Sequence, residues 1–220
     1  MSKVLQVDAL AALIPDGASI MIGGFMGVGS PLRMIDALIA RGARDLTIIA
    51  NDTAHPGFAI GKLIDAGCVS KVIASHIGLN PVTQKAMIAG DIAVELVPQG
   101  TLAERIRAGG FGLGGILTAT GIGTVVEDGK QVIESDGEVY LLEKPLKADF
   151  ALVKAKTADH GGNLEYSLTA RNFNPMMPMA AATVIAEVDH IVPLGGMPPD
   201  NVVTPGVLVD YLVAKEASHG

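Results

Sequence analysis

The sequence predicts an α/β fold, with an open, doubly wound, mostly parallel sheet, helices on both faces and a small β-hairpin flap. Three observations predict it. Apolar strand patterns alternate with helix patterns through the first two-thirds of the chain, which is typical of parallel crossovers. Hydrophobic residues make up 49% and charged residues only 18% of the 220 residues. The strands are continuous apolar runs, as expected for strands covered on both faces.

The first strand and helix enclose a glycine-rich loop. Residues 19–24, "SIMIGG", read as a short buried strand, and the stretch "PLRMIDALIARG" reads as a helix with one apolar face. We expect Ser30 to cap this helix and Pro31 to lie in its first turn. Gly42 is expected to end it.

The same alternation continues to about residue 110. Asn80 is expected to cap a helix that begins with Pro81. The remaining elements are predicted as strand 46–50, loop 51–57, helix 60–66, strand 71–75, strand 93–97 and a helix in "PQGTLAERIRAGG". In such sheets ligands gather at the carboxyl ends of the strands. We therefore expect one rim to hold Gly23 to Gly29, Asn51 to Thr53, Ser75 to Gly78 and Pro98 to Thr101.

The alternation of strand and helix patterns ends after Gly109. A glycine-rich segment is followed by "QVIESDGEVYLLE", which reads as two short strands about an Asp-Gly turn. We interpret residues 110–147 as a flap inserted into a single domain that covers residues 1–220. Buried strand patterns resume at 149–155 and 183–188.

Composition restricts the partners. The formal net charge is -7 and the 16 basic residues are scattered, so neither a nucleic acid nor an anionic membrane surface is an expected partner. The N-terminal segment has no apolar core suited to a signal peptide, which favours a cytoplasmic protein. The single cysteine, Cys68, reads as a small buried hydrophobe.

The loop from Gly23 to Gly29 runs G-G-x-x-G-x-G, so it does not match the dinucleotide pattern G-x-G-x-x-G. Glycines allow close approach of a ligand, and the following helix start favours an anionic group such as phosphate or carboxylate. A purely structural glycine turn explains the spacing equally well. Gly110, Gly112 and Gly115 do spell the dinucleotide pattern, but they follow a helix, which excludes that site.

Other chemical motifs are missing from the sequence. The five histidines show no metal-ligand spacing. His55 and His76 fall at strand ends, where a substrate contact is conceivable, although isolated histidines are more often surface or packing residues. The carboxylates considered have no acid-base partner and are expected to be solvated or salt-bridged: Glu95, Glu104, Glu127 and Glu143. The motifs alone indicate a ligand-binding domain without an identifiable nucleophile.

The stretch "DGASIMIGGFMGVGSP", Asp16 to Pro31, resembles the signature of family I coenzyme A transferases in every element. That signature reads Asp or Asn, Gly, two residues, three apolar residues, Gly-Gly-Phe, three residues, Gly, any residue, Pro. Further stretches resemble the α subunits of that family, among them "ANDTAHPG", "VPQGTLAERIRAGGFGLGG", "ARNFNP" and "TPGVLVDYL". The resemblance covers essentially the whole chain and is strongest to subunits acting on acetate, butyrate and acetoacetate.

The resemblance implies transfer of coenzyme A between a short-chain acyl-CoA or acetoacetyl-CoA and a free carboxylate. In the family a glutamate of the β subunit forms an acyl anhydride and then a glutamyl-CoA thioester. This chain, ending at Gly220, is thus expected to be the α subunit of an αβ enzyme, such as an α2β2 assembly, with coenzyme A as substrate and no permanent cofactor.

The resemblance also implies roles for individual residues. Gln99 would donate a hydrogen bond to the thioester oxygen, and Asn51 would help to position the carboxylate and the glutamate. The coenzyme A and substrate contacts would come from the glycine loop, namely Gly23, Gly24, Phe25, Met26, Gly27, Val28 and Gly29. Its rival role is to shape the glutamate pocket, since in some relatives the β half carries most nucleotide contacts.

Two other functions fit parts of the sequence. A stand-alone sugar-phosphate isomerase is associated with the same fold class, and the glycine loop suits a phosphate. That function would require activity from this chain alone. A non-catalytic effector-binding domain of a regulator is the second alternative, although no helix-turn-helix or basic segment accompanies it.

Overall fold

The computed structural model describes residues 3–213 and has a nine-stranded sheet at its centre. Eight strands follow the order β1-β12-β11-β9-β2-β3-β4-β5, and every pair of neighbours along this path is parallel. A ninth strand, β10, pairs with β9 in the antiparallel sense. The bounds are β1 Val4–Leu5, β2 Ser19–Ile22, β3 Leu46–Asp52, β4 Val69–His76, β5 Ala93–Leu96, β9 Ala148–Asp159, β10 Leu164–Glu165, β11 Ala181–Val192 and β12 Tyr211–Val213.

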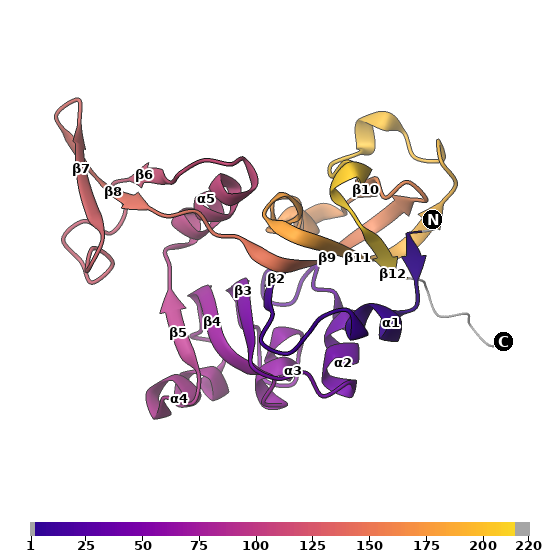
Figure 1. The fold of residues 1–220 in the computed structure, drawn as a ribbon, viewed down its shortest axis with the longest axis horizontal. Coiled ribbons are helices and arrows are strands. Elements are labelled where there is room, and N and C mark those ends of the chain that lie inside the picture. The colour runs from indigo at the N-terminus through magenta and orange to yellow at the C-terminus, as the bar shows by residue number, and fades with distance from the viewer. Residues whose placement is uncertain (1–2, 214–220) are drawn as a thin grey trace.

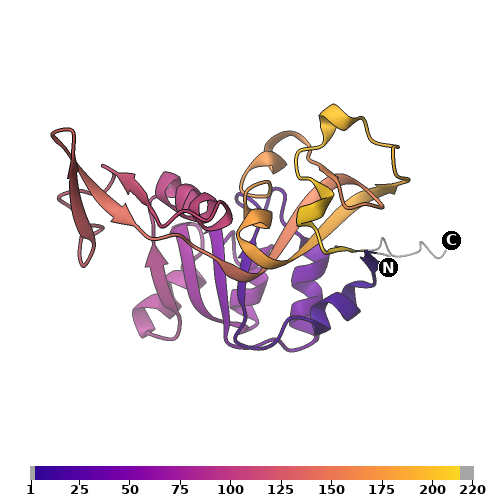
Figure 2. The same cartoon turned by 45° about the horizontal axis from the view of Figure 1, so that its top comes forward.

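Helices cover both faces of this sheet (Figures 1 and 2). Strand residues alternate between two cores: Ile48 packs in the core that contains Leu10 of α1, whereas Ile49 packs in the core that contains Leu102 of α5. The first core is covered by α1 (Val7–Ala12), α2 (Leu32–Ala40), α3 (Ile60–Asp65) and α4 (Pro81–Ala89). The second is covered by α5 (Gln99–Gly110) and the 3-10 helix η2 (Met177–Met179). The predicted fold class is confirmed.

One predicted helix start is confirmed and another is wrong. The Asn80 side chain accepts hydrogen bonds from the backbone N–H groups of Val82 and Thr83 at 3.1 and 3.2 Å, and Pro81 is the first residue of α4. At α2, by contrast, Pro31 itself is the capping residue and makes no side-chain hydrogen bond there. Ser30 does not cap the helix, because a carboxylate from a distant strand takes that place, as described below.

The flap is a separate three-stranded antiparallel sheet that projects from one end of the molecule (Figure 1). It orders β6 (Ile116–Thr118), β8 (Glu138–Glu143) and β7 (Gln131–Ser135). The predicted hairpin is confirmed: Asp136 and Gly137 have φ of 54° and 79°, the left-handed pair that a two-residue turn of this kind requires. The third strand, β6, was not predicted, because it has only three residues and lies within a glycine-rich segment.

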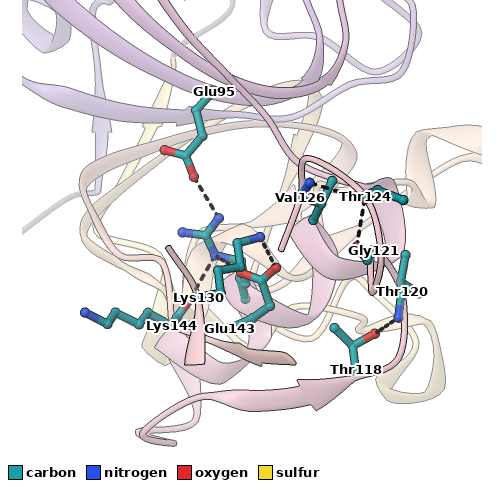
Figure 3. Close-up of polar contacts among 10 residues, drawn as sticks. Glu95, Thr118, Thr120, Gly121, Thr124, Val126, Lys130, Glu143 and Lys144 are labelled. Atoms are coloured by element: carbon teal, nitrogen blue, oxygen red, sulfur yellow. Dashed lines mark hydrogen bonds and ion pairs between the residues drawn. The ribbon is translucent and has the colours of Figure 1, made fainter. Parts of the chain in front are cut away.

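Charged side chains attach the flap to the main body (Figure 3). Arg105 of α5 contacts Glu95 of β5 through Nη1 at 2.9 Å and donates from Nε to the carbonyl oxygen of Lys144 at 2.9 Å. Arg105 Nε also lies 3.9 Å from Oε2 of Glu143 in β8, and Glu143, which is only 2% exposed, pairs within the flap with Lys130. The salt-bridged role expected for Glu95 and Glu143 is therefore confirmed.

Four further 3-10 and terminal features complete the described chain: η1 (Leu168–Arg171), η3 (Pro199–Asn201), η4 (Gly206–Leu208) and the parallel pairing of β1 with β12. Within residues 3–213, no helix is both long and apolar enough to cross a membrane.

Candidate functional site

The four rim segments predicted from the sequence meet at a hydrogen-bonded network. Its centre is Asn51, which lies near the carboxyl end of β3 and is 2% exposed. Gln99, the first residue of α5, donates from Nε2 to Asn51 Oδ1 at 2.6 Å. Ser75, near the end of β4, donates from Oγ toward the backbone oxygen of Asn51 at 2.8 Å. The structure thus brings together the two residues for which the resemblance implied catalytic roles.

Asp52 joins this pair to the glycine loop. One carboxylate oxygen, Oδ2, accepts hydrogen bonds from Asn51 Nδ2 at 2.7 Å and from the backbone N–H of Met26 at 2.8 Å. The other, Oδ1, accepts from the backbone N–H of Ala54 at 2.8 Å. Asp52 is 6% exposed. Sequence reasoning did not single it out, since its only signal was its place at the end of a predicted strand.

The glycine loop contains a tight turn from Phe25 to Val28. These two residues exchange both backbone hydrogen bonds, at 3.1 and 2.9 Å. Met26 and Gly27 between them have φ of 48° and 84°, an arrangement that glycine adopts freely and that costs other residues about 1–2 kcal/mol. The ring of Phe58 lies against Gly27, so that a Cβ atom there would fall 2.1 Å from Phe58 Cε1. The turn is therefore fixed by Asp52 at Met26 and by Phe58 at Gly27.

Two asparagines after β10 brace the same loop from behind. Asn172 accepts a hydrogen bond from the backbone N–H of Gly24 at 3.2 Å and donates to the carbonyl oxygen of Val28 at 3.0 Å. Asn174, which is fully buried, donates to the carbonyl oxygen of Gly29 at 2.9 Å. Sequence reasoning gave neither residue a role, because nothing local in "ARNFNP" shows that it lies beneath a loop 145 residues earlier.

The start of α2 binds a carboxylate of the chain itself. Glu187 of β11 is 3% exposed, and its Oε2 accepts hydrogen bonds from the backbone N–H groups of Arg33 and Met34 at 2.8 and 3.1 Å. The sequence predicted an anionic group at this helix start and left a structural turn open as the alternative. The structure places an internal carboxylate there, so these two amides are occupied without a ligand.

An apolar groove lies on the outer side of the glycine loop. It has a volume of about 400 Å³ and is lined by Phe25, Val28, Leu168, Thr169, Arg171 and Asn172. Leu168 is 85% exposed and Val28 is 52% exposed. Large apolar side chains left open beside a polar network are typical of a ligand or partner surface.

This arrangement can supply a hydrogen-bond donor but not a free carboxylate. A carboxamide nitrogen carries two hydrogens, and Gln99, which is exposed, gives one to Asn51. Among residues 3–213, the only carboxylate bonded to the pair is that of Asp52, which three N–H groups already occupy. The same part of the chain shows no group of residues suited to a metal ion. Within it, the side chains of His55 and His76 form no hydrogen bond with the network, although His76 lies opposite Asp52 in the pairing of β3 with β4.

Comparison with known proteins adds independent information. A family profile described as coenzyme A transferase matches residues 4–215. The chain is 52% identical over 217 residues to the acetate CoA-transferase subunit alpha of Escherichia coli (strain K12), covering 99% of both chains. It is 50% identical over 216 residues to the acetoacetyl-CoA:acetate/butyrate CoA transferase alpha subunit of Clostridium acetobutylicum, covering 98% of this chain and 99% of that one.

A solved structure shares the fold. The acyl-CoA transferase of Escherichia coli O157:H7, in a thioester complex with CoA, matches with a TM-score of 0.86 and 25% identity. The match covers 97% of this chain and 47% of that one. This chain therefore spans about half the length of that structure.

Proposed function

Because the chain belongs to the coenzyme A transferase family, we propose that it is the α subunit of an enzyme that moves coenzyme A from a short-chain acyl-CoA or acetoacetyl-CoA to a free carboxylate such as acetate, butyrate or acetoacetate. The names of the two relatives, each about as long as this chain, support both the substrate class and the subunit type. A β subunit, in an assembly such as α2β2, is the corresponding partner.

The observation that carries this proposal is that Asp52, the carboxylate bonded to the Asn51–Gln99 pair, is already fully hydrogen-bonded. Asp52 is buried and accepts three hydrogen bonds, so it is a poor nucleophile toward a thioester. Gln99 and Asn51 nevertheless form a donor site at the sheet rim. A site with a donor and no available nucleophile is half of an acyl-transfer centre, and the nucleophilic glutamate is then supplied by the β subunit.

In the proposed reaction, the glutamate carboxylate of the β subunit attacks the thioester carbonyl, and coenzyme A leaves as a thiolate to give an acyl-glutamyl anhydride. The thiolate then attacks the glutamyl carbonyl, which releases the carboxylate and forms a glutamyl-CoA thioester. The acceptor carboxylate reverses these steps. The second Nε2 hydrogen of Gln99 is donated to the thioester oxygen as negative charge develops there, a contribution commonly worth about 3 kcal/mol.

The glycine loop contributes shape rather than amide donors in this proposal. The backbone N–H groups of Gly23, Gly24, Phe25, Met26 and Val28 already bond within the chain. Phe25, Val28 and the neighbouring groove offer apolar surface to the acyl and pantetheine part of the substrate. Gly27 and Gly29 permit the turn that presents this surface.

The test is to purify this chain alone and together with its β subunit and to measure exchange between acetoacetyl-CoA and acetate. Activity is expected only for the complex. Preincubation of the complex with acyl-CoA followed by borohydride should convert one glutamate to its alcohol, identified by peptide mass spectrometry, in the β subunit. A sample without acyl-CoA is the control. Modification of this chain, or exchange by this chain alone, would contradict the proposal.

A further inference from the structure

We propose that Asp52 is a positioning residue that fixes the direction in which the carboxamides of Asn51 and Gln99 face. The inference deepens the proposed function, on which it rests, because it explains how the donor at Gln99 is held ready for a thioester oxygen. The inference follows from which end of each side chain in the network can donate a hydrogen bond and which can only accept one.

The first step concerns Asp52 and Asn51. Both oxygens of an aspartate carboxylate accept hydrogen bonds, whereas a carboxamide has one accepting and one donating end. The Asn51 side chain lies 2.7 Å from Asp52 Oδ2, so only its Nδ2 end can face that oxygen. The Oδ1 end of Asn51 must then face away from Asp52.

The second step concerns Asn51 and Gln99. Asn51 Oδ1, turned away from Asp52, lies 2.6 Å from the Gln99 carboxamide and can only accept. Gln99 must therefore present Nε2. The Ser75 hydroxyl, 3.1 Å from the same Oδ1, agrees with this polarity because it can donate. If Asn51 were reversed, Gln99 would present its oxygen to Asn51, and its Nε2 donor would move to the opposite side of the carboxamide, away from the proposed position of the thioester oxygen.

The third step concerns how Asp52 itself is held. The backbone N–H groups of Met26 and Ala54 both donate to its carboxylate at 2.8 Å. Ala54 has φ of 52° and Met26 has φ of 48°, so both donors stand at strained backbone positions. The carboxylate thus bonds both to the glycine-loop turn and to the Asn51–Gln99 pair. A movement of the turn would therefore also displace the Gln99 donor.

The experiment compares Asp52→Ala with Asp159→Ala in the complex with the β subunit. Asp159 is a matched control: it is 5% exposed, and it also accepts from an asparagine carboxamide, that of Asn163, at 2.8 Å. We expect Asp52→Ala to lower kcat by about tenfold to a hundredfold with KM changed by less than about threefold. Asp159→Ala should lower the melting temperature and leave kcat within about twofold.

A second readout follows the donor directly. The measurement uses an acyl-CoA labelled with carbon-13 at the thioester, bound to a complex whose β-subunit glutamate is replaced so that the thioester persists. Its carbonyl stretching frequency falls when a hydrogen bond is donated to the oxygen. Asp52→Ala should raise this frequency toward the value in water-free solvent, whereas Asp159→Ala should not. A merely structural role for Asp52 would affect stability alone. Unchanged kcat and frequency in an assembled Asp52→Ala complex would overturn the proposal.

Two further experiments keep the test decisive. Asp52→Asn keeps one accepting oxygen, which can serve the donors at Oδ2 or the donor at Oδ1 but not both. Its kcat should therefore lie between those of wild type and Asp52→Ala, and it replaces Asp52→Ala if that variant does not assemble. If the wild-type complex shows no exchange, the proposed function fails, and a crystal structure of the Asp52 variant then tests the positioning role. An Asn51–Gln99 contact unchanged there would contradict it.

Discussion

The carboxylate of Glu187 accepts a hydrogen bond from the backbone N–H of Met34 at 3.1 Å, although 153 residues separate the two. Strand β11 and helix α2 are joined by this contact, and the positive end of the helix is neutralised by it. Glu187 Oε1 also pairs with Arg33 Nε at 3.4 Å and Lys154 Nζ at 3.6 Å. The group therefore combines a helix cap with a buried ion pair.

Glu187→Ala should lower the free energy of unfolding by about 2–3 kcal/mol, since a lost cap costs about 1–2 kcal/mol and the loss of the ion pairs with the partly buried Arg33 and Lys154 adds to it. Asp189→Ala is the control: Asp189 pairs with the same Lys154 but its side chain is 53% exposed, so about 0–1 kcal/mol is expected. Chemical denaturation of both variants measures this difference. Equal losses would show that the cap contributes nothing.

Gly27→Ala tests the turn beside the proposed substrate surface. Gly17→Ala is its matched control, because both glycines have positive φ, 84° and 78°, but a Cβ at Gly17 meets nothing within 4 Å. Both variants should lose about 1–2 kcal/mol of stability from backbone strain. Only Gly27→Ala should displace the Phe58 ring and lower exchange, by about tenfold.

Adding Phe58→Ala to Gly27→Ala should recover part of the lost exchange, since the clash at 2.1 Å is with that ring. Initial rates with the β subunit present measure the effect. The role of the turn would be wrong if Gly17→Ala and Gly27→Ala reduced exchange to the same degree.

The parts of the structure that could be predicted are those whose signal is local. Asn80 and Pro81 stand side by side in the sequence, and the structure confirms the helix start that they predict. The rim could also be predicted, because parallel strands end at one edge whatever their order. That geometry predicts that Gln99 and Asn51 lie on the same rim, whereas their direct hydrogen bond is a finding of the structure.

The parts that could not be predicted depend on distant partners. Ser30 looked like a cap, yet the acceptor at α2 is Glu187, and no spacing in the sequence connects the two. Asn174 contacts the glycine loop only because β9 lies beside β2 in the sheet. Asp52 was overlooked for a different reason: a carboxylate occupied by backbone N–H groups has no partner residue type to search for.

Asp149 predicts how stability responds to acid. The Ser19 hydroxyl, at 2.6 Å, and then the Ser19 backbone N–H, at 2.8 Å, donate to its carboxylate and hold its pKa below the ordinary value. A lowered folded-state pKa contributes stability above the unfolded value of about 4 and loses it as pH falls through the folded value. Melting temperature should therefore decline more gently below about pH 4 in Asp149→Asn than in wild type.

The control for this prediction is Asp200→Asn, at an exposed position of η3. It should follow the wild-type acid profile. At neutral pH, Asp149→Asn should also melt at a lower temperature than Asp200→Asn, because the contact between the starts of β2 and β9 is weakened. Identical acid profiles for the two variants would contradict the assignment to Asp149.

Gln99→Ala tests the donor itself. Gln99 is exposed at the start of α5, so its truncation should leave the melting temperature and the assembly with the β subunit nearly unchanged. The turnover number should fall by about a hundredfold to a thousandfold, because a donor to developing negative charge stabilises the transition state more than the bound substrate. Gln131→Ala, at an exposed position in the flap, is the matched control and should keep full turnover.

Gln99→Glu separates the size of the side chain from its polarity. It fills the same space but offers no donor in its ionised form, and its carboxylate faces the accepting oxygen of Asn51. It should be at least as slow as Gln99→Ala. Turnover within about twofold of wild type in either variant would remove Gln99 from this role.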